Sequence, residues 1–241
     1  MIVLFTDFGL AGPYTGQMKA VLRREAPQTE IIDLFADAPA GDPRASAYLL
    51  AAYAAWFPHG TIFLSIVDPG VGGARAPLMI EADRRWYVGP ENGLFELVLR
   101  RAQNIRCHEI TWHPPKLSAS FQGRDLFAPV AAMLARAERP HVRARETIRQ
   151  PQWPDDLAEI VYVDHYGNAM TGLRGSTLSE RATLILGDKT RVIHAATFSA
   201  VPEGNAFWYE NSNGLVEIAV NRGRAADLLH LAIGSTLTIE T

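Results

Sequence analysis

Hydrophobic and polar positions follow different patterns in the two parts of the chain. Over residues 1–140, short apolar runs typical of strands alternate with stretches whose apolar residues have helical spacing. The expected strands are 2–5, 31–34, 61–67, 78–80 and 86–88. The expected helices are near 13–22, 42–56, 92–101 and 124–138. This alternation predicts an α/β domain with a mainly parallel sheet covered by helices.

The pattern changes after Arg139 and Pro140. Residues 141–157 are rich in arginine and proline with little periodicity, which predicts a linker. Short apolar runs separated by glycine and asparagine turns follow, at 160–163, 183–186, 191–193, 206–209, 215–220 and 235–239. Residues 158–241 are therefore expected to form a small all-β, barrel-like domain.

Composition narrows the kind of partner. The 241 residues are 48% hydrophobic, and 23 Lys and Arg against 26 Asp and Glu give a net charge of −3. The chain has no cluster of Lys and Arg of the kind that proteins use to bind nucleic acid phosphates, so nucleic acid binding is not expected. One cysteine, Cys107, provides no disulfide framework and no cysteine-based zinc cage. We expect a small-molecule partner.

The same apolar patterns bear on location. The longest apolar stretch, 47–57, is well short of the roughly 20 residues that a membrane helix needs. The first residues have no basic segment and become polar too early for a secretory signal. These features favour a cytoplasmic protein without membrane contact.

Candidate chemistry gathers where strands are expected to end. The chain has no phosphate-binding loop, nucleophile elbow, zinc-protease helix or dinucleotide fingerprint. Asp7 follows the first strand, and Asp68 follows the third in a glycine-rich turn that continues to Arg75. Because ligands of open α/β sheets bind at the carboxyl ends of strands, both carboxylates are site candidates. The alternative is that each Asp caps a turn or a helix.

Three further segments, 88–95, 120–129 and 163–168, are dense in polar groups with apolar neighbours. For Asn92 and Gly93 we favour a turn and helix cap. Arg124 and Asp125 have an equally good interpretation as an ion pair at a helix start. The run from Asp164 to Asn168 could be a simple hairpin turn.

Together these motifs resemble one family. The matching segments are 6–9, 14–19, 67–72, 89–94, 123–132, 164–168 and 211–219. They are similar, in order and over nearly the whole chain, to the S-adenosyl-L-methionine (SAM) hydroxide adenosyltransferases, which are SAM hydrolases related to fluorinating and chlorinating enzymes. The resemblance implies attack of water or hydroxide on C5′ of SAM, giving adenosine and L-methionine, with no metal or separate cofactor. It also implies an α/β domain, a β-barrel domain and a homotrimer whose active sites lie between subunits.

The resemblance assigns roles to individual residues. Asp7 would bind the ribose hydroxyls and Phe121 would line the ribose side. Tyr166 and Phe198 would enclose the adenine, whose edge Asn168 would read. Asp164 would bind the methionine ammonium and Ser212 its carboxylate. The remaining substrate-binding candidates are Phe8, Asn213 and Glu217.

The water-activating group departs from the family pattern at one position. Asp68 and Arg75 match the family's Asp and Arg, but Gln122 stands where His is usual. Glutamine can hydrogen-bond a water molecule but cannot take its proton. The fluorinating relative has Ser at the position of Gly123, so halide chemistry is disfavoured.

Three hypotheses follow, in order of preference. The first is an active SAM hydrolase. The second is a protein that binds SAM or adenosine with impaired turnover, because Gln122 replaces the His. The third is a metal-dependent phosphohydrolase built on Asp7, Asp68 and Asp125, which lacks a histidine at ligand spacing and a phosphate-cradling loop.

Overall fold

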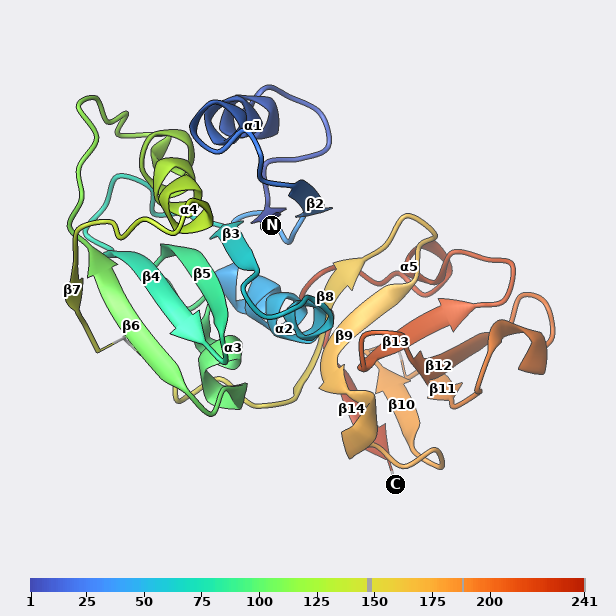
Figure 1. The fold of residues 1–241 in the computed structure, drawn as a ribbon. Helices are drawn as coiled ribbons and strands as arrows, with labels where there is room; N and C mark the ends of the chain where they lie inside the picture. Colours follow the sequence, from blue (N-terminus) through green and yellow to red (C-terminus); the bar gives the residue numbers. More distant parts are fainter. Residues whose placement is uncertain (147–148, 188, 241) are drawn as a thin grey trace. The chain divides into compact units, whose positions relative to one another are not determined.

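The computed structural model describes residues 1–146, 149–187 and 189–240. The chain divides into two compact units, Met1–Gln150 and Pro151–Thr241 (Figure 1). Among the helices of these residues, none combines the length and the apolar character that crossing a bilayer requires.

The first unit is built on one seven-stranded sheet with the order β2-β1-β3-β5-β4-β6-β7. Its strands are β1 (Ile2–Thr6), β2 (Ile31–Phe35), β3 (Ile62–Ile66), β4 (Pro77–Ala82), β5 (Arg85–Pro90), β6 (Ile105–Ile110) and β7 (Val142–Ala144). The first four strands in this order pair in parallel, but β4, β6 and β7 pair antiparallel with their neighbours.

The sheet is therefore mixed, and the expectation of a mainly parallel sheet holds for one half of it. Only Asp83 and Arg84 connect β4 to β5, and both have positive φ, 44° and 65°. A two-residue loop of this kind can join only antiparallel neighbours.

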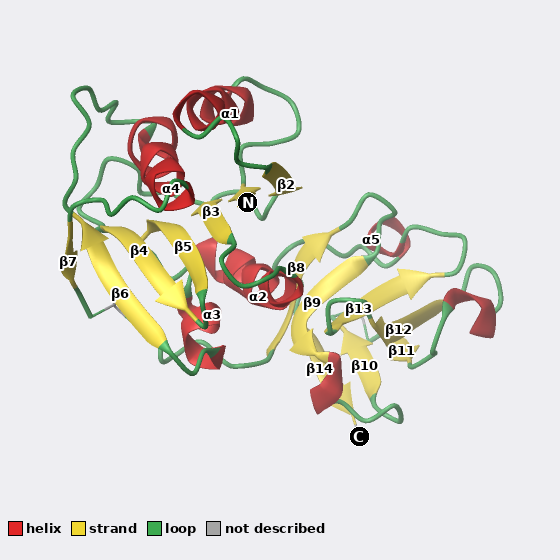
Figure 2. Ribbon diagram, in the orientation of Figure 1, coloured by secondary structure: helices red, strands yellow, loops and turns green. Residues whose placement is uncertain are grey.

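Helices cover both faces of this sheet. They are α1 (Tyr14–Glu25), α2 (Pro43–Tyr53), α3 (Glu96–Arg101) and α4 (Ala128–Ala135). Met18 and Leu22 of α1 pack with Val130 of α4 in the same core cluster as Leu4 and Leu64 of the strands. Figure 2 shows α2 and α3 on the opposite face. As expected, α2 is buried on most sides, and the Asp42 side chain caps its first turn.

The helix expected at 124–138 differs in shape. Gly123–Phe127 forms a single π-helical segment, and the α-helix begins only at Ala128. Pro129 lies in the first turn of α4, where its missing N–H removes one hydrogen bond to the preceding turn. The chain can therefore take a wider turn just before α4.

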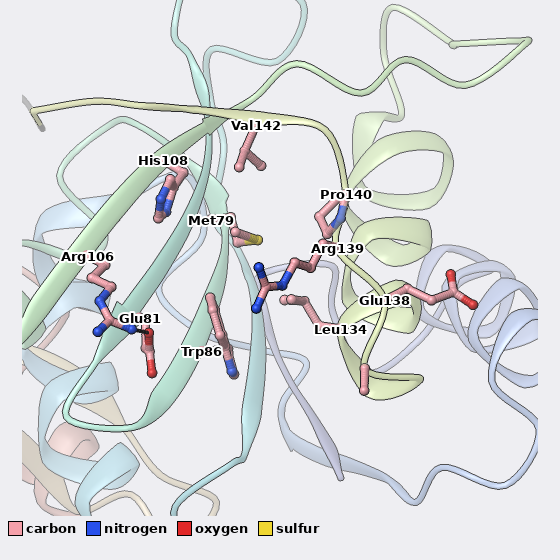
Figure 3. Close-up of a pocket in the computed structure, with 11 residues that line it drawn as sticks. Met79, Glu81, Trp86, Arg106, His108, Leu134, Glu138, Arg139, Pro140 and Val142 are labelled. Atoms are coloured by element: carbon pink, nitrogen blue, oxygen red, sulfur yellow. Dashed lines mark hydrogen bonds and ion pairs between the residues drawn. The ribbon is translucent and has the colours of Figure 1, made fainter.

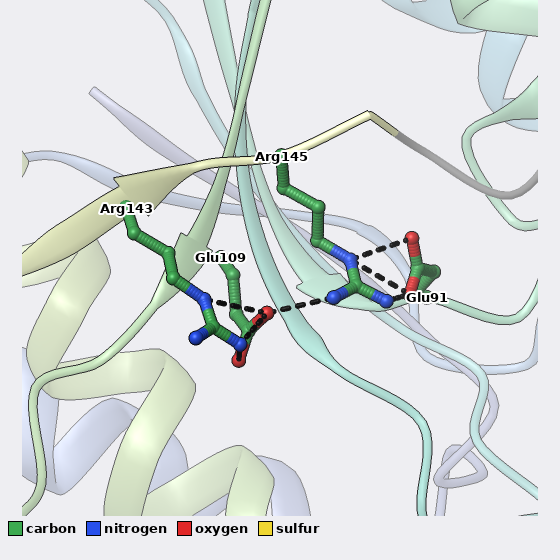
Figure 4. A network of polar contacts seen from close by, with 4 residues as sticks. All are labelled: Glu91, Glu109, Arg143 and Arg145. Carbon is green, nitrogen blue, oxygen red and sulfur yellow. Dashed lines mark hydrogen bonds and ion pairs between the residues drawn. The ribbon is translucent and has the colours of Figure 1, made fainter.

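Two strands of the first unit, β6 and β7, were not expected. The sequence of β6 is largely polar because much of it is exposed. Strand β7 lies inside the segment 141–157 that was expected to be a linker, and it pairs with β6. Figure 4 shows charged groups that fasten this segment. Arg145 Nη2 donates to the buried Glu91 carboxylate at 2.6 Å and Arg145 Nη1 to Glu109 at 2.8 Å. Arg143 also binds Glu109, at 2.9 Å.

The second unit contains two antiparallel sheets, ordered β12-β13-β9-β8 and β11-β10-β14. The strands are β8 (Leu157–Val163), β9 (Ala169–Arg174), β10 (Thr183–Leu186), β11 (Arg191–Ile193), β12 (Ala206–Glu210), β13 (Leu215–Val220) and β14 (Leu237–Glu240), and one short helix, α5 (Ala225–Leu228), follows β13. Trp208 is buried in the shared core, and its indole N–H donates to the Ala182 carbonyl at 3.0 Å.

The all-β expectation for this unit is met, but its described strands do not form one closed sheet. Isolated bridges between Glu159 and Thr236 and between His194 and Trp208 link the two sheets locally. The β8–β9 pairing shifts register twice between Leu157 and Tyr162. Bulges of this kind bend a strand and interrupt its ladder, and the described strands form two antiparallel sheets where a barrel-like sheet was expected.

Candidate active site

Two carboxylates meet at the carboxyl ends of β1 and β3. Asp7 follows β1, and its Oδ2 accepts a hydrogen bond from the Gly41 N–H at 2.8 Å. Burial raises the pKa of Asp7, the nearby Asp68 charge raises it further, and the Gly41 N–H lowers it. Because β1 and β3 are parallel neighbours, the two acids emerge at the same edge, as expected.

Asp68 forms a buried ion pair with Arg75. Its side chain is 5% exposed and that of Arg75 is 10% exposed. Arg75 Nε donates to Asp68 Oδ2 at 2.9 Å, and Nη2 contacts the same oxygen. Within the described residues the other oxygen, Oδ1, is buried without a hydrogen-bond partner. A buried carboxylate oxygen is costly when unpaired, so this atom is available to a water or a substrate hydroxyl.

The turn between Asp68 and Arg75 depends on close backbone contacts. Gly72 has φ +80°, and a Cβ there would lie 2.7 Å from the Ala119 carbonyl oxygen. Asn92 Nδ2 donates to the Val67 carbonyl at 2.8 Å. Asn92 is thus a turn residue that holds the end of β3, as expected, but it does not cap the next helix, whose N-cap residue is Phe95.

Aromatic rings lie next to this edge. Phe8, Tyr14 and Phe121 pack against one another with ring centroids 5.4–5.9 Å apart. A Cβ at Gly123 would lie 3.0 Å from Ile66 and 3.4 Å from Phe8, so the π-helical turn begins beside the ends of β1 and β3. Tyr14 was not a site candidate because its helical spacing indicated a core position.

Gln122 directly precedes that turn and is half-buried. Among the described residues its side chain has no hydrogen-bond partner. Arg124 and Asp125, in contrast, form an ion pair with a 2.6 Å contact, and Asp125 also accepts from the Ser118 N–H at 2.9 Å. The Arg124 guanidinium lowers the pKa of Asp125. The structural interpretation of this pair is therefore confirmed.

The third hypothesis required Asp7, Asp68 and Asp125 to act together on a metal. In the part of the chain that the structure describes, no three His, Cys, Asp or Glu side chains form a group that could hold a metal ion. Asp125 instead forms an ion pair with Arg124.

A second polar group lies in the Pro151–Thr241 unit. Asp164 Oδ1 accepts from the Asn168 N–H at 2.8 Å, and Oδ2 accepts from its side-chain amide at 3.2 Å. These bonds close the turn between β8 and β9, so the hairpin interpretation of 164–168 is also correct. Gly167 has φ +82° and packs against Arg224, where a Cβ would lie 2.7 Å from the Arg224 Cβ.

Glu217 of β13 lies beneath this turn and is buried. It accepts from the Tyr209 hydroxyl at 2.5 Å and from Asn211 Nδ2 at 2.8 Å. Burial raises the pKa of Glu217, the nearby Asp164 charge raises it further, and the donors Tyr209, Asn211 and Asn168 oppose the change. Asp164, Asn168 and Glu217 thus form one connected polar group.

The remaining candidates of this unit surround the group. Phe198 packs on Phe207 and Tyr209, with centroids 5.0 and 5.7 Å away. Tyr166 is 73% exposed, and its ring contacts His165. Ser212 and Asn213 lie in the turn between β12 and β13, where the Asn213 N–H donates to Asn211 Oδ1 at 2.9 Å.

Family models match both units. The model of the SAM hydroxide adenosyltransferase N-terminal domain matches residues 2–143, and that of the C-terminal domain matches residues 158–238. The chain belongs to the SAM hydroxide adenosyltransferase family.

Individual relatives agree over nearly their full lengths. An (R)-S-adenosyl-L-methionine hydrolase of Salinispora arenicola is 36% identical over 97% of this chain and 95% of its own. Another, of Thermus thermophilus, is 37% identical over 97% and 96%. The crystal structure of an uncharacterized conserved protein from Thermotoga maritima is 29% identical, covers 100% of both chains and aligns with a TM-score of 0.84.

Three residues of the aromatic group and of the Glu217 group were not among the site residues expected from the sequence. Tyr14 completes the aromatic group, and Tyr209 and Asn211 hold Glu217. Tyr209 lies directly opposite Glu217 in the β12–β13 ladder, and this contact depends on the register of the two strands. Strand pairing places these side chains together, and pairing is invisible in a single sequence without the turn geometry.

Proposed function

We propose that this protein hydrolyses (R)-S-adenosyl-L-methionine to adenosine and L-methionine. The observation that carries the proposal is the buried Asp68–Arg75 pair with an unpartnered carboxylate oxygen, in a chain whose full-length relatives are named (R)-SAM hydrolases. Those names support a hydrolase over the alternative of a binding protein with impaired turnover.

The reaction is a displacement at C5′. A water oxygen forms the new bond to C5′, the C5′–S bond breaks, and the electron pair of that bond returns to sulfur. Because the leaving group is a neutral thioether, no general acid is needed. Charge and mass balance when the water releases one proton to the solvent, and no metal or separate cofactor takes part.

Asp68 and Arg75 have distinct roles in this proposal. Oδ1 of Asp68 accepts a hydrogen bond from the attacking water and directs its lone pair toward C5′. Arg75 holds the other oxygen, which fixes the orientation of the carboxylate. Gln122 provides an amide that can orient the water without accepting its proton.

The other candidates hold the substrate. We assign Asp7 to the ribose hydroxyls, since a carboxylate accepts two hydrogen bonds. Asp164 takes the methionine ammonium. The remaining contacts are Phe8 and Phe121 at the ribose, Tyr166, Phe198 and Asn168 at the adenine, Ser212 and Asn213 at the methionine carboxylate, and Glu217 at the base of the Asp164 group.

We further propose a homotrimer in which each active site takes residues from two subunits. Support comes from the family membership and from the distribution of the candidates, which fall into one group in each unit. The cytoplasmic location expected from the sequence stays a prediction, which fractionation of the source cells would test.

Product analysis with separated sulfonium epimers tests the proposal. We expect adenosine and methionine in equal amounts from (R)-SAM and far slower release from the (S) epimer. Formation of methylthioadenosine, or equal rates with both epimers, would contradict the proposed reaction or its stereochemistry.

A further inference from the structure

A cavity of about 600 Å³ lies in the first unit, between the sheet and the end of α4 (Figure 3). Its lining comes from β5, β4, β6 and β7 and from the end of α4, whereas Asp7 and Asp68 follow β1 and β3 on the other side of the strand order. Trp86 pairs with Ile62, the first residue of β3, whereas Asp68 lies two residues beyond Ile66, the last residue of that strand. At about 3.3 Å per residue, the two positions are roughly 20 Å apart. The cavity is therefore separate from the candidate active site.

The charges around this cavity do not balance. Glu81 is paired with Arg106 at 3.0 Å, and Glu138 is paired with Arg136 at 2.6 Å. Arg139 has no acidic partner in the described residues, and Figure 3 shows its side chain extending across the cavity toward Trp86. An unmatched guanidinium attracts an anion and can bind a carboxylate through two parallel hydrogen bonds.

A second polar group in the same wall is also unmatched. His108 lies on β6, and within the described part of the chain its Nδ1 is buried without a hydrogen-bond partner. That nitrogen is closed off from the cavity as well as from solvent, so it does not contact a ligand there. Arg139 is the group that offers contacts to a polar head group.

The rest of the lining is apolar. Met79, Trp86, Leu134 and Val142 supply most of it, and Trp86 also packs against the main core cluster. A volume of this size is typical of small-molecule sites, which combine apolar walls with a few polar groups.

We propose that this cavity binds a small organic carboxylate with an apolar or aromatic body. The carboxylate lies against Arg139, and the body lies on Trp86 and Met79. The site is independent of SAM hydrolysis, because none of these residues belongs to the Asp68 group.

The test uses 4-phenylbutyrate as probe and its neutral amide, 4-phenylbutanamide, as matched control. Calorimetric titration of the full chain is expected to show saturable binding of one phenylbutyrate per chain and at least about tenfold weaker binding of the amide. In nuclear magnetic resonance spectra the indole N–H signal of Trp86, assigned with a Trp86→Phe variant, should shift on binding.

Variants separate this site from others. Arg139→Gln should weaken phenylbutyrate binding at least about tenfold, because the exposed guanidinium is the main anion contact. Arg23→Gln, which changes another exposed arginine on α1, should leave binding unchanged, as should Asp68→Asn in the candidate active site. The proposal is overturned by no saturable binding at millimolar probe, by equal affinity for acid and amide, or by an undiminished affinity in Arg139→Gln.

Discussion

At the scale of single residues, the Asp68 carboxylate has one oxygen fixed by Arg75 and one oxygen without a partner in the described residues. Gln122 directly precedes the π-helical turn, which begins beside the end of the same strand. In the proposed mechanism, Asp68 is the charged acceptor for the water and Gln122 is a neutral amide that cannot take its proton.

Replacing Gln122 by His should raise the rate of SAM hydrolysis and leave SAM affinity nearly unchanged. Imidazole can take a proton near neutral pH, whereas a carboxamide cannot, and a positioned general base is typically worth about 10²- to 10⁴-fold. Steady-state rates at several pH values and calorimetric titration measure the two effects. If wild type is inert and only the variant turns over, the natural protein is a SAM binder.

Glu217 gives a pH dependence of stability with a defined sign. Burial raises its pKa above the ordinary 4.5, so the folded protein holds this proton more tightly than the unfolded chain does. Its contribution to the free energy of unfolding is greatest below pH 4.5 and decreases as the pH rises through the raised pKa.

In Glu217→Gln the free energy of unfolding should not show this decrease, because the variant has no carboxyl group to titrate. The difference in free energy of unfolding between wild type and variant should therefore shrink or change sign as the pH rises. Urea unfolding at pH values from below 4.5 to neutral measures it. The exposed Glu180→Gln should follow the wild-type profile. A parallel course of wild type and Glu217→Gln would show that the buried carboxyl does not set the dependence.

At the scale of elements, the sequence predicted some strands and missed others. The strand ends that carry Asp7 and Asp68 were predictable, because β1 and β3 are largely apolar runs that are followed by polar and glycine-rich turns. Strand β9 was not, since its sequence includes Thr171 and Gly172 and lacks the apolar alternation of a strand. Its formation depends on pairing with both β8 and β13.

The same limit applies to contacts between elements. The aromatic pair Phe8 and Phe121 was identified one residue at a time, whereas its packing on Tyr14 arises only when α1 and the π-helical turn come together. Long-range packing of this kind has no local sequence signal.

Gly72→Ala should destabilise the protein by about 1–3 kcal/mol and lower turnover. The residue has φ +80°, and its new Cβ would press on the Ala119 carbonyl, which displaces the turn that holds Asp68. Gly60→Ala is the matched control, because φ there is +84° but nothing lies within 4 Å of the new Cβ. Thermal unfolding and SAM turnover are measured for both. Equal losses in the two variants would mean that the contact with Ala119 is unimportant.

At the scale of the whole molecule, the candidates fall into two groups, one in Met1–Gln150 and one in Pro151–Thr241. In our assignment, the residue that binds the water lies in the first unit and the residue that binds the methionine ammonium lies in the second. The proposed homotrimer predicts that a complete site forms from the two units of different subunits.

Mixed trimers of Asp68→Asn and Asp164→Asn should therefore regain activity that neither variant has alone. In every trimer that contains both variants, about one site in three combines an intact first unit with an intact second unit from another subunit. Both substitutions preserve side-chain shape, so assembly should be normal. The proteins are co-expressed with different tags, purified through both tags and assayed. Absence of recovered activity in such mixed assemblies would place both groups of a site in one subunit.

The most direct test of the central claim is SAM turnover in water enriched in ¹⁸O, with wild type and Asp68→Asn. Our account predicts adenosine and methionine in equal amounts, with ¹⁸O in the 5′-hydroxyl of adenosine and none in methionine beyond exchange. It also predicts that Asp68→Asn binds SAM, unfolds at the wild-type temperature and yields no product. Wild-type turnover in Asp68→Asn, or adenosine without the label, would contradict water attack at C5′ directed by Asp68.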